Sequence, residues 1–198
     1  IVSEFNLKNK KVLISFESKS IGDTLAWAPY VVDFAKKHDC KVALSTFHNN
    51  WFKDVKEYSN IEFITPCQSV ICDTIYRIGW FRSDDNKWDK FDSYPNPLNS
   101  QPLQKTSSDI LGLDFVEKNY GINFKPKNRT YQDKYIVIAP ESTAGCKEWS
   151  YDSWKILTKM LVEEGYKVIC LTNKPYSLKD AICIHGKSLE ETFNIMYH

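Results

Sequence analysis

Short apolar runs alternate with stretches of helical periodicity along the first third of the chain. Three runs are typical of buried parallel strands: residues 11–16, 41–46 and 61–66. Four apolar residues recur at helical spacing after the first run: Leu25, Ala28, Val32 and Ala35. They predict a helix from Gly22 to about His38, and a shorter helix is expected over residues 49–58. This order of elements predicts a doubly wound parallel sheet.

The middle of the chain departs from this rhythm. Residues 69–81 contain a further strand-like run, and a polar stretch with three closely spaced prolines follows it. Such a stretch is too long for a plain connection and indicates a functional or mobile loop. A helix is expected from about Pro102 to Tyr120, interrupted at Gly112.

The alternation of strand and helix resumes at Tyr135. Strands are expected over 135–140, 166–172 and 181–186. One helix is expected over 150–165, and another begins with a capping box formed by Ser188 and Glu191. Because the chain stops within this apolar helix, we expect an incomplete α/β domain.

The pattern therefore predicts an α/β protein with two lobes. The N-terminal lobe, residues 1–124, is a doubly wound parallel sheet. Residues 125–134 are basic and polar without apolar periodicity, which is typical of a linker. Residues 135–198 form the first part of a second, Rossmann-like lobe. In such folds we expect ligands between the lobes, at the carboxyl ends of the strands.

Composition and charge restrict the partners. The formal net charge of +1 gives no electrostatic basis for binding nucleic acid or an anionic membrane, so neither is expected. No apolar run approaches the ~20 residues that span a bilayer, and the start of the chain lacks the features of a signal peptide. Six cysteines without a CxxC pair favour buried free thiols in the cytoplasm. Cys67 and Cys72 are an isolated pair, which is weak evidence for a metal site.

The loop over residues 140–150 follows one predicted strand and precedes a helix, a position that favours anions. Ser142 and Thr143 offer hydroxyls, Gly145 permits close approach of the backbone, and Lys147 supplies a positive charge. Together these residues can hold the diphosphate of a nucleotide, although the loop is neither a Walker A nor a GxGxxG motif. The alternative is that Lys147 is simply solvated and that Ser150 caps the helix.

Asp23 stands at the start of the first predicted helix, where two roles are open. Aspartate is a preferred N-cap, and the helix dipole stabilises its ionised form. A carboxylate there can also act as a base in glycosyl transfer, because the attacking hydroxyl becomes acidic as its bond to the sugar forms. Pro29 lies within the same helix and predicts a kink.

Three stretches carry a family resemblance: "SIGDTLAWAPYVVDFAKKH", "APESTAGCKEWSYDSWKILTKMLVEEGYKVICLT" and "GKSLEETFNIMYH". Together they resemble the bacterial autotransporter O-heptosyltransferases, heptosyltransferase-like glycosyltransferases of the GT-B type. The first stretch is similar to the family's G-D-x-x-x-x-x-P element, and the second to its diphosphate-side loop. The resemblance covers nearly the whole chain and is least distinctive over residues 82–120.

The resemblance implies transfer of heptose from an ADP-activated sugar to serine hydroxyls of an autotransporter adhesin, without a metal. It places Asp23 on the family's proposed catalytic base and Lys147 on a basic residue that faces the donor phosphates. Ser142 and Thr143 fall on the same donor loop. Nothing in the resemblance assigns a resident cofactor to this chain.

Members of the family that the chain resembles carry an iron-binding cysteine motif near the C-terminus and assemble into large homo-oligomers. This sequence ends before any such motif, so no metal ligand is assigned and a homo-oligomer is expected only by resemblance. Two other functions are consistent with the sequence. One is a non-catalytic module that binds a nucleotide or a partner, and the other is an enzyme similar to a nucleotide-sugar epimerase.

Overall fold

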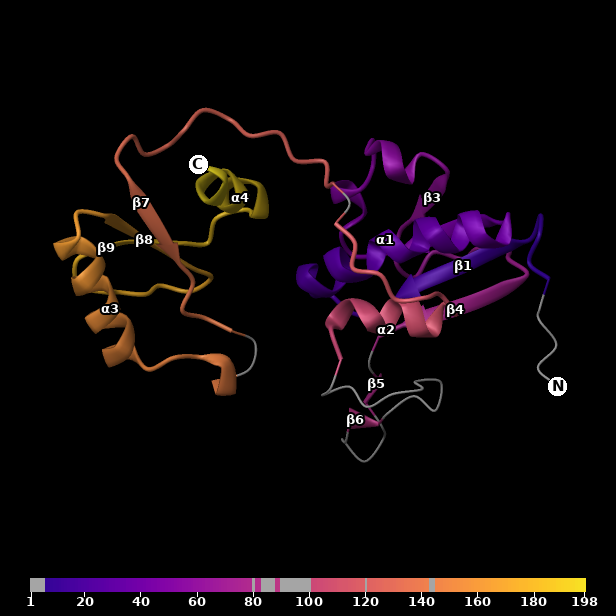
Figure 1. The fold of residues 1–198 in the computed structure, drawn as a ribbon, viewed down its shortest axis with the longest axis horizontal. Coiled ribbons are helices and arrows are strands. Elements are labelled where there is room, and N and C mark those ends of the chain that lie inside the picture. Colours follow the sequence, from indigo (N-terminus) through magenta and orange to yellow (C-terminus); the bar gives the residue numbers. More distant parts are fainter. Residues whose placement is uncertain (1–5, 80, 83–87, 90–100, 120, 143–144) are drawn as a thin grey trace. The chain divides into compact units, whose positions relative to one another are not determined.

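The computed structural model describes residues 6–79, 81–82, 88–89, 101–119, 121–142 and 145–198. The chain divides into two compact units, Ile1–Asn123 and Phe124–His198. Each unit contains a parallel sheet flanked by helices (Figure 1). No helix in these described ranges is long and apolar enough to cross a membrane.

The first unit is built on a four-stranded parallel sheet in the order β3-β2-β1-β4. Its strands are β1 (Lys11–Phe16), β2 (Lys41–Ser45), β3 (Ile61–Ile64) and β4 (Thr74–Ile78). Alternate residues of β1 are fully buried, so one face of this strand packs on the core. Two short strands, β5 (Phe81–Arg82) and β6 (Trp88–Asp89), pair antiparallel outside this sheet.

Helix α1 (Ile21–His38) supplies much of the core of the first unit. Its largest buried side chains are Trp27, Tyr30 and Phe34. The helix continues through Pro29 as one element. Helix α2 (Leu103–Ile110) lies against α1, and the indole Nε1 of Trp27 donates a hydrogen bond to the Leu103 carbonyl at 3.1 Å.

Two predicted helices differ from the observed structure. The helix expected over 102–120 is shorter, because Gly112 adopts a φ of 62° and ends the helical turn after α2. The helix expected over 49–58 is two short 3₁₀ turns, η1 (Asn49–Trp51) and η2 (Lys56–Tyr58). Between them Asp54 has a φ of 66°, a left-handed conformation that interrupts a helix.

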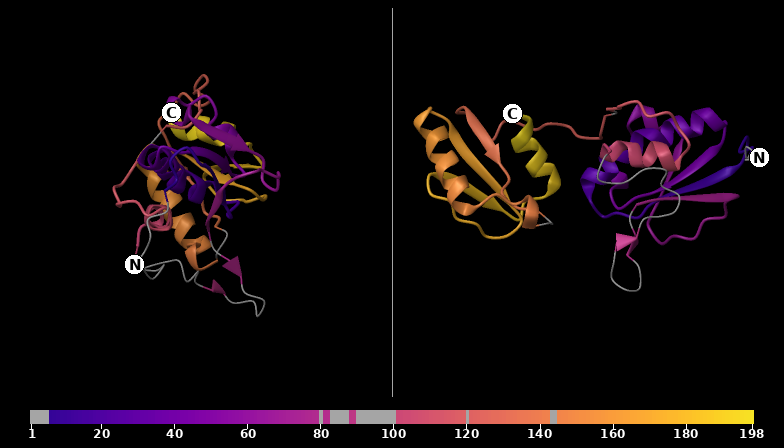
Figure 2. Two further views of the ribbon diagram at one scale, coloured as in Figure 1. Left: turned by 90° about the vertical axis from the view of Figure 1, so that its right-hand side faces the viewer. Right: turned by 60° about the horizontal axis from the view of Figure 1, so that its bottom comes forward.

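The second unit is a three-layered α/β arrangement. Its parallel sheet has the order β7-β8-β9, formed by β7 (Tyr135–Ile138), β8 (Lys167–Thr172) and β9 (Ala181–His185). Helices α3 (Tyr151–Glu163) and α4 (Leu189–Tyr197) lie on opposite faces of this sheet (Figure 2). Successive residues of β8 serve the two cores: Val168 and Cys170 belong to one cluster, and Ile169 and Leu171 to the other.

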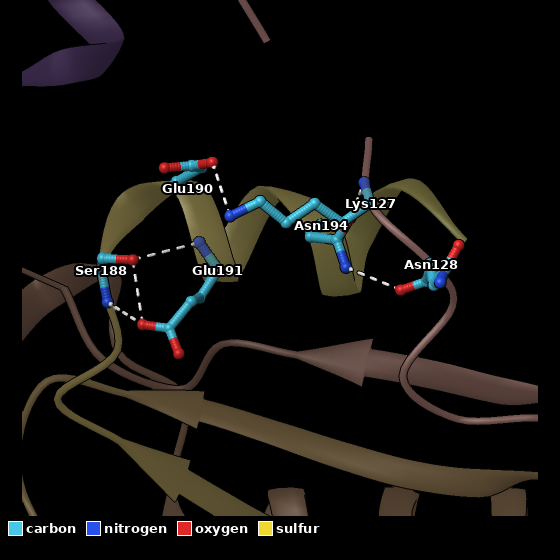
Figure 3. Close-up of polar contacts among 6 residues, drawn as sticks. All are labelled: Lys127, Asn128, Ser188, Glu190, Glu191 and Asn194. Atoms are coloured by element: carbon cyan, nitrogen blue, oxygen red, sulfur yellow. Dashed lines mark hydrogen bonds and ion pairs between the residues drawn. The ribbon is translucent and has the colours of Figure 1, made fainter. Parts of the chain in front are cut away.

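The segment predicted as a linker, residues 125–134, packs on α4 and belongs to the second unit. The buried side chain of Asn194 accepts a hydrogen bond from the Lys127 N–H at 2.7 Å and donates one to the Asn128 carbonyl at 3.3 Å (Figure 3). The predicted capping box is also present, since Ser188 and Glu191 bond each other's backbone N–H groups. The side chain of Asn194 thus holds the backbone of the polar segment 125–134 against α4 through these two hydrogen bonds.

Candidate functional site

The first candidate site lies where β1 and β4 end. Strand β1 has β2 on one side and β4 on the other, so the chain changes direction across the sheet at this point. Ligands in open α/β sheets bind at such switch points, outside the carboxyl ends of the strands. The Glu17 N–H donates to the Ile78 carbonyl at 2.8 Å and continues the pairing of the two strands up to this edge.

A bidentate ion pair strengthens the same edge. The Nε and Nη2 atoms of Arg77 donate to the two carboxylate oxygens of Glu17 at 3.0 and 3.1 Å. This contact lowers the pKa of the Glu17 carboxyl from its ordinary value and raises that of Arg77. The end of β1 is therefore tied to β4 by both backbone and side-chain contacts.

Asp23 is the third residue of α1, and the interpretation of Asp23 as the helix cap is wrong. The cap is Ser20, which has extended backbone angles and whose Oγ accepts the Asp23 N–H at 3.4 Å. The chain thus enters the helix at Ile21, so the Asp23 carboxylate is not used on the helix's own N–H groups.

The Asp23 carboxylate is instead held by the loop that precedes the helix. The hydroxyl of Ser18 donates a hydrogen bond to Oδ2 of Asp23 at 2.6 Å. Within the part of the chain that the structure describes, Oδ1 takes no hydrogen bond, and the side chain is half-buried. One oxygen is positioned and the other can accept a proton, as a general base requires.

The second candidate site is the loop after β7. The Ser142 N–H donates a hydrogen bond to Oε1 of Glu148 at 3.0 Å, so this backbone amide already has a carboxylate of the same chain as its acceptor. Gly145 and Lys147 begin and end the 3₁₀ turn η4 (Gly145–Lys147), and both are exposed. A Cβ at Gly145 would meet nothing within 4 Å. Thr143 lies outside the described residues.

Ser150 caps α3, as the alternative interpretation of this loop predicts. Its Oγ accepts the Ser153 N–H at 3.1 Å. Both η4 and the N-terminus of α3 therefore follow the carboxyl end of β7. Such an N-terminus favours an anionic group, and the exposed Lys147 adds a compact positive charge in the 3₁₀ turn that precedes it.

A cavity of about 290 Å³ lies at the carboxyl ends of the three strands of the second unit. Its polar lining residues come from the end of β8, from the loops after all three strands and from α4: Glu141, Thr172, Asn173, Lys187 and Thr192. The carboxylate of Glu141 accepts the Asn173 N–H, which ties the ends of β7 and β8 together. The sequence analysis missed this cavity because its lining is spread over four separate elements.

The cysteines form free thiols in different environments. Cys170 is fully buried, and burial, followed by the neighbouring thiol of Cys183, raises its pKa to about 12. Cys67 and Cys146 are exposed, so the expectation that the thiols are buried holds for Cys170 alone among the six. Among the residues with described positions, no three His, Cys, Asp or Glu side chains are grouped as a metal site.

Comparison with known proteins links the chain to heptosyltransferases. The profile of glycosyltransferase family 9 (heptosyltransferase) matches residues 102–194. The autotransporter heptosyltransferase Aah of Escherichia coli is 30% identical over 174 residues, which are 86% of this chain and 43% of Aah. The inactive autotransporter heptosyltransferase BimC of Burkholderia thailandensis is 27% identical over 180 residues, 89% of this chain and 41% of BimC. The chain thus spans less than half the length of these curated relatives.

Solved structures show the same relationship. The iron-containing dodecameric glycosyltransferase TibC of enterotoxigenic E. coli superimposes with a TM-score of 0.81 at 25% identity, over 98% of this chain and 52% of TibC. A second TibC structure contains ADP-D-β-D-heptose and has a TM-score of 0.80 at 25% identity, over 97% of this chain and 52% of TibC. The E. coli heptosyltransferase WaaC with ADP has a TM-score of 0.53 at 13% identity, over 94% of this chain and 78% of WaaC, and supports the fold alone. These matches confirm the predicted GT-B-like α/β fold and the resemblance inferred from the sequence: the chain is similar in sequence and in fold to autotransporter heptosyltransferases.

Proposed function

We propose that the protein containing this chain transfers heptose from an ADP-activated sugar to serine hydroxyls of an autotransporter-type adhesin. The observation that carries the proposal is the carboxylate of Asp23. It lies after the carboxyl end of β1, is oriented by Ser18, and is left available because Ser20 caps the helix. The similarity to TibC, which has been solved with ADP-D-β-D-heptose, supports the choice of donor.

In the proposed step, an Asp23 carboxylate oxygen accepts the proton of the serine hydroxyl. The hydroxyl oxygen forms a bond to the anomeric carbon of heptose, and the bond from that carbon to the diphosphate oxygen breaks. ADP leaves with the electron pair, and Asp23 becomes protonated. The proton on the hydroxyl becomes more acidic as the new bond forms, so a carboxylate is a sufficient base at that stage.

On the donor side, we assign the loop from Ser142 to Lys147 to the diphosphate, with Thr143 and Gly145 as part of the loop. Lys147 neutralises the charge that develops on the leaving ADP, since fixed positive groups at such positions stabilise the transition state. Glu141, which lines the cavity together with Asn173, directly precedes this loop in the sequence. The cavity offers polar groups that can bind the rest of the nucleotide.

The remaining parts of the proposal concern location and assembly. We place the protein in the cytoplasm, in keeping with its free thiols. A homo-oligomer is proposed by analogy with TibC, which is described as dodecameric. No metal or resident cofactor is included in the reaction, because the charge needed at the leaving group is assigned to Lys147.

Transfer is tested with the full-length protein, ADP-heptose and a purified adhesin fragment that contains serines. Intact-mass spectrometry should show an increase by whole heptosyl residues, and peptide mapping should place them on serine. The same reaction should continue with a chelator present. An unchanged adhesin mass contradicts the proposal, and isomerisation of the sugar without an acceptor would favour the epimerase-like enzyme.

A second function, a non-catalytic binding module, is favoured by one comparison. BimC is described as inactive and is 27% identical to this chain. In that case ADP or an ADP-sugar should raise the melting temperature of the protein, or the adhesin should bind, while no heptose is transferred. The mass measurement above therefore separates the two functions.

A further inference from the structure

We infer that Ser18 and His48 are positioning residues that set the direction of the Asp23 carboxylate for proton transfer. This inference rests on the proposed function, because it assumes that Asp23 is the base. Neither residue was a candidate in the sequence analysis. Both act through the loop over residues 17–20, which connects β1 with α1.

The hydroxyl of Ser18 has a defined direction because it makes two contacts. Its oxygen accepts the Ser20 N–H at 3.1 Å, and its proton is donated to Oδ2 of Asp23 at 2.6 Å. The Asp23 N–H in turn donates to the Oγ of Ser20. These three hydrogen bonds form a closed loop of contacts that fixes both the backbone and the side chain of Asp23.

His48 contacts the same loop from the turn after the neighbouring strand β2. Its Nε2 lies 2.9 Å from the carbonyl oxygen of Lys19. Because a carbonyl only accepts, the ring must donate this hydrogen bond through Nε2–H, which the imidazolium and one neutral tautomer both carry. The ammonium of Lys19 also lies 5.4 Å from the ring centre of Phe47, a second contact between the two loops.

The position of His48 is itself fixed by the turn after β2. The His48 N–H donates to Oγ1 of Thr46 at 2.9 Å, and that hydroxyl donates to Oδ1 of Asn49 at 3.0 Å. The amide of Asn49 then donates to the Ile64 carbonyl at 2.6 Å, at the end of β3. A continuous set of hydrogen bonds therefore runs from the end of β3 to the loop that carries Ser18.

These contacts favour a positioning role over a purely structural one. Lys19 and Ser20 are exposed, and Ser18 and His48 are only half-buried, so the contacts bury little apolar surface. Their shared effect is to restrict the loop that orients one carboxylate. Misplacement of a reacting group by about 1 Å can reduce a rate by about 10²-fold.

The test compares four variants of the full-length protein, and a fifth as control, by steady-state transfer kinetics. Ser18→Ala and His48→Leu should each lower kcat by about 10- to 100-fold, with KM for the ADP-sugar and the adhesin within about twofold of wild type. Ser18→Thr keeps the hydroxyl and His48→Gln keeps an N–H donor, so both should recover most of kcat. Ser59→Ala, an exposed serine outside these contacts, is the matched control.

Folding is checked by circular dichroism and melting temperature. If Ser18→Ala is unfolded, Ser18→Cys replaces it, since it keeps the size and weakens the donor. Wild-type kcat in both Ser18→Ala and His48→Leu, while Asp23→Asn is inactive, overturns this inference alone. Full activity of Asp23→Asn overturns the proposed base and this inference with it, and so does a wild-type protein that transfers no heptose.

Discussion

Ser18 and Asp23 stand on either side of the start of α1, and the Ser18 hydroxyl donates a 2.6 Å hydrogen bond to Oδ2 of Asp23. The sequence leaves two roles open for Asp23, helix cap and base, and the structure distinguishes between them. Ser20 caps the helix, while Asp23 keeps a carboxylate directed by the preceding loop. The same short segment can therefore begin a helix and present a carboxylate that the helix does not use.

The first prediction concerns the charge at the leaving group. Lys147→Ala should lower kcat for heptose transfer by about 10²-fold, because it removes the positive charge assigned to the departing ADP. Steady-state kinetics with ADP-heptose would measure this loss. Lys155→Ala removes an exposed lysine from α3 and should leave kcat unchanged. Equal rates for Lys147→Ala and wild type would remove Lys147 from the mechanism.

The second prediction concerns the close approach of Gly79 to Glu17. A Cβ at Gly79 would lie 2.7 Å from the Cβ of Glu17, and the residue has a φ of 154°. Gly79→Ala should therefore lower the free energy of unfolding by about 1–3 kcal/mol. Gly121→Ala is the matched control, since a Cβ there meets nothing within 4 Å. Urea unfolding of both variants would measure the difference, and equal stabilities would show that the strands adjust without cost.

The strands were predictable because buried parallel strands are short apolar runs with polar limits. The capping box at Ser188 was predictable for a similar reason, since its residues are neighbours in sequence. The limits of the helix after Pro102 were not, because its apolar periodicity continues past Gly112, where the positive φ ends the helix. Local patterns contain no information on which backbone angle a glycine adopts.

The contacts of the proposed base were less accessible to the sequence than the candidate residue itself. The sequence left the helix cap and the base open as two roles of Asp23, and only the geometry assigns the cap to Ser20. His48 reaches the loop from 29 residues away, a distance that no periodicity reveals. The packing of residues 125–134 depends likewise on Asn194, which is far along the chain.

The third prediction concerns pH and the capping box of α4. Hydrogen bonds from Lys187, then from Ser188, lower the pKa of Glu191 from 4.5 to about 2. A lowered pKa in the folded state stabilises the protein above the ordinary pKa, and this stabilisation is lost as the pH falls toward 2. The stability difference between wild type and Glu191→Gln should thus be full above about pH 4.5 and shrink below it.

Urea unfolding of both proteins at a series of pH values would measure that difference. Lys187→Met removes the largest cause of the shift and should weaken the same pH dependence. A difference between wild type and Glu191→Gln that stays constant from pH 6 to the acid limit of folding, on the order of pH 3, would contradict the assignment.

The fourth prediction concerns Asn194, which is buried and bonds the backbone of Lys127 and Asn128 (Figure 3). Asn194→Ala leaves these backbone groups without partners and should lower the free energy of unfolding by about 1–3 kcal/mol. Asn60→Ala, at an exposed position of the first unit, should change it by less than about 0.5 kcal/mol. Hydrogen exchange of the Lys127 amide would show the loss directly, and unchanged protection would contradict this role of Asn194.

The central claim is that the carboxylate of Asp23 accepts the proton of the acceptor hydroxyl. The most direct measurement is the single-turnover rate of heptose transfer by full-length Asp23→Asn, beside Asp54→Asn as the control for an exposed aspartate. The amide keeps the shape of the side chain but is not a base, so the rate should fall by about 10²- to 10⁴-fold while Asp54→Asn matches wild type. A rate for Asp23→Asn within about twofold of wild type would contradict the account.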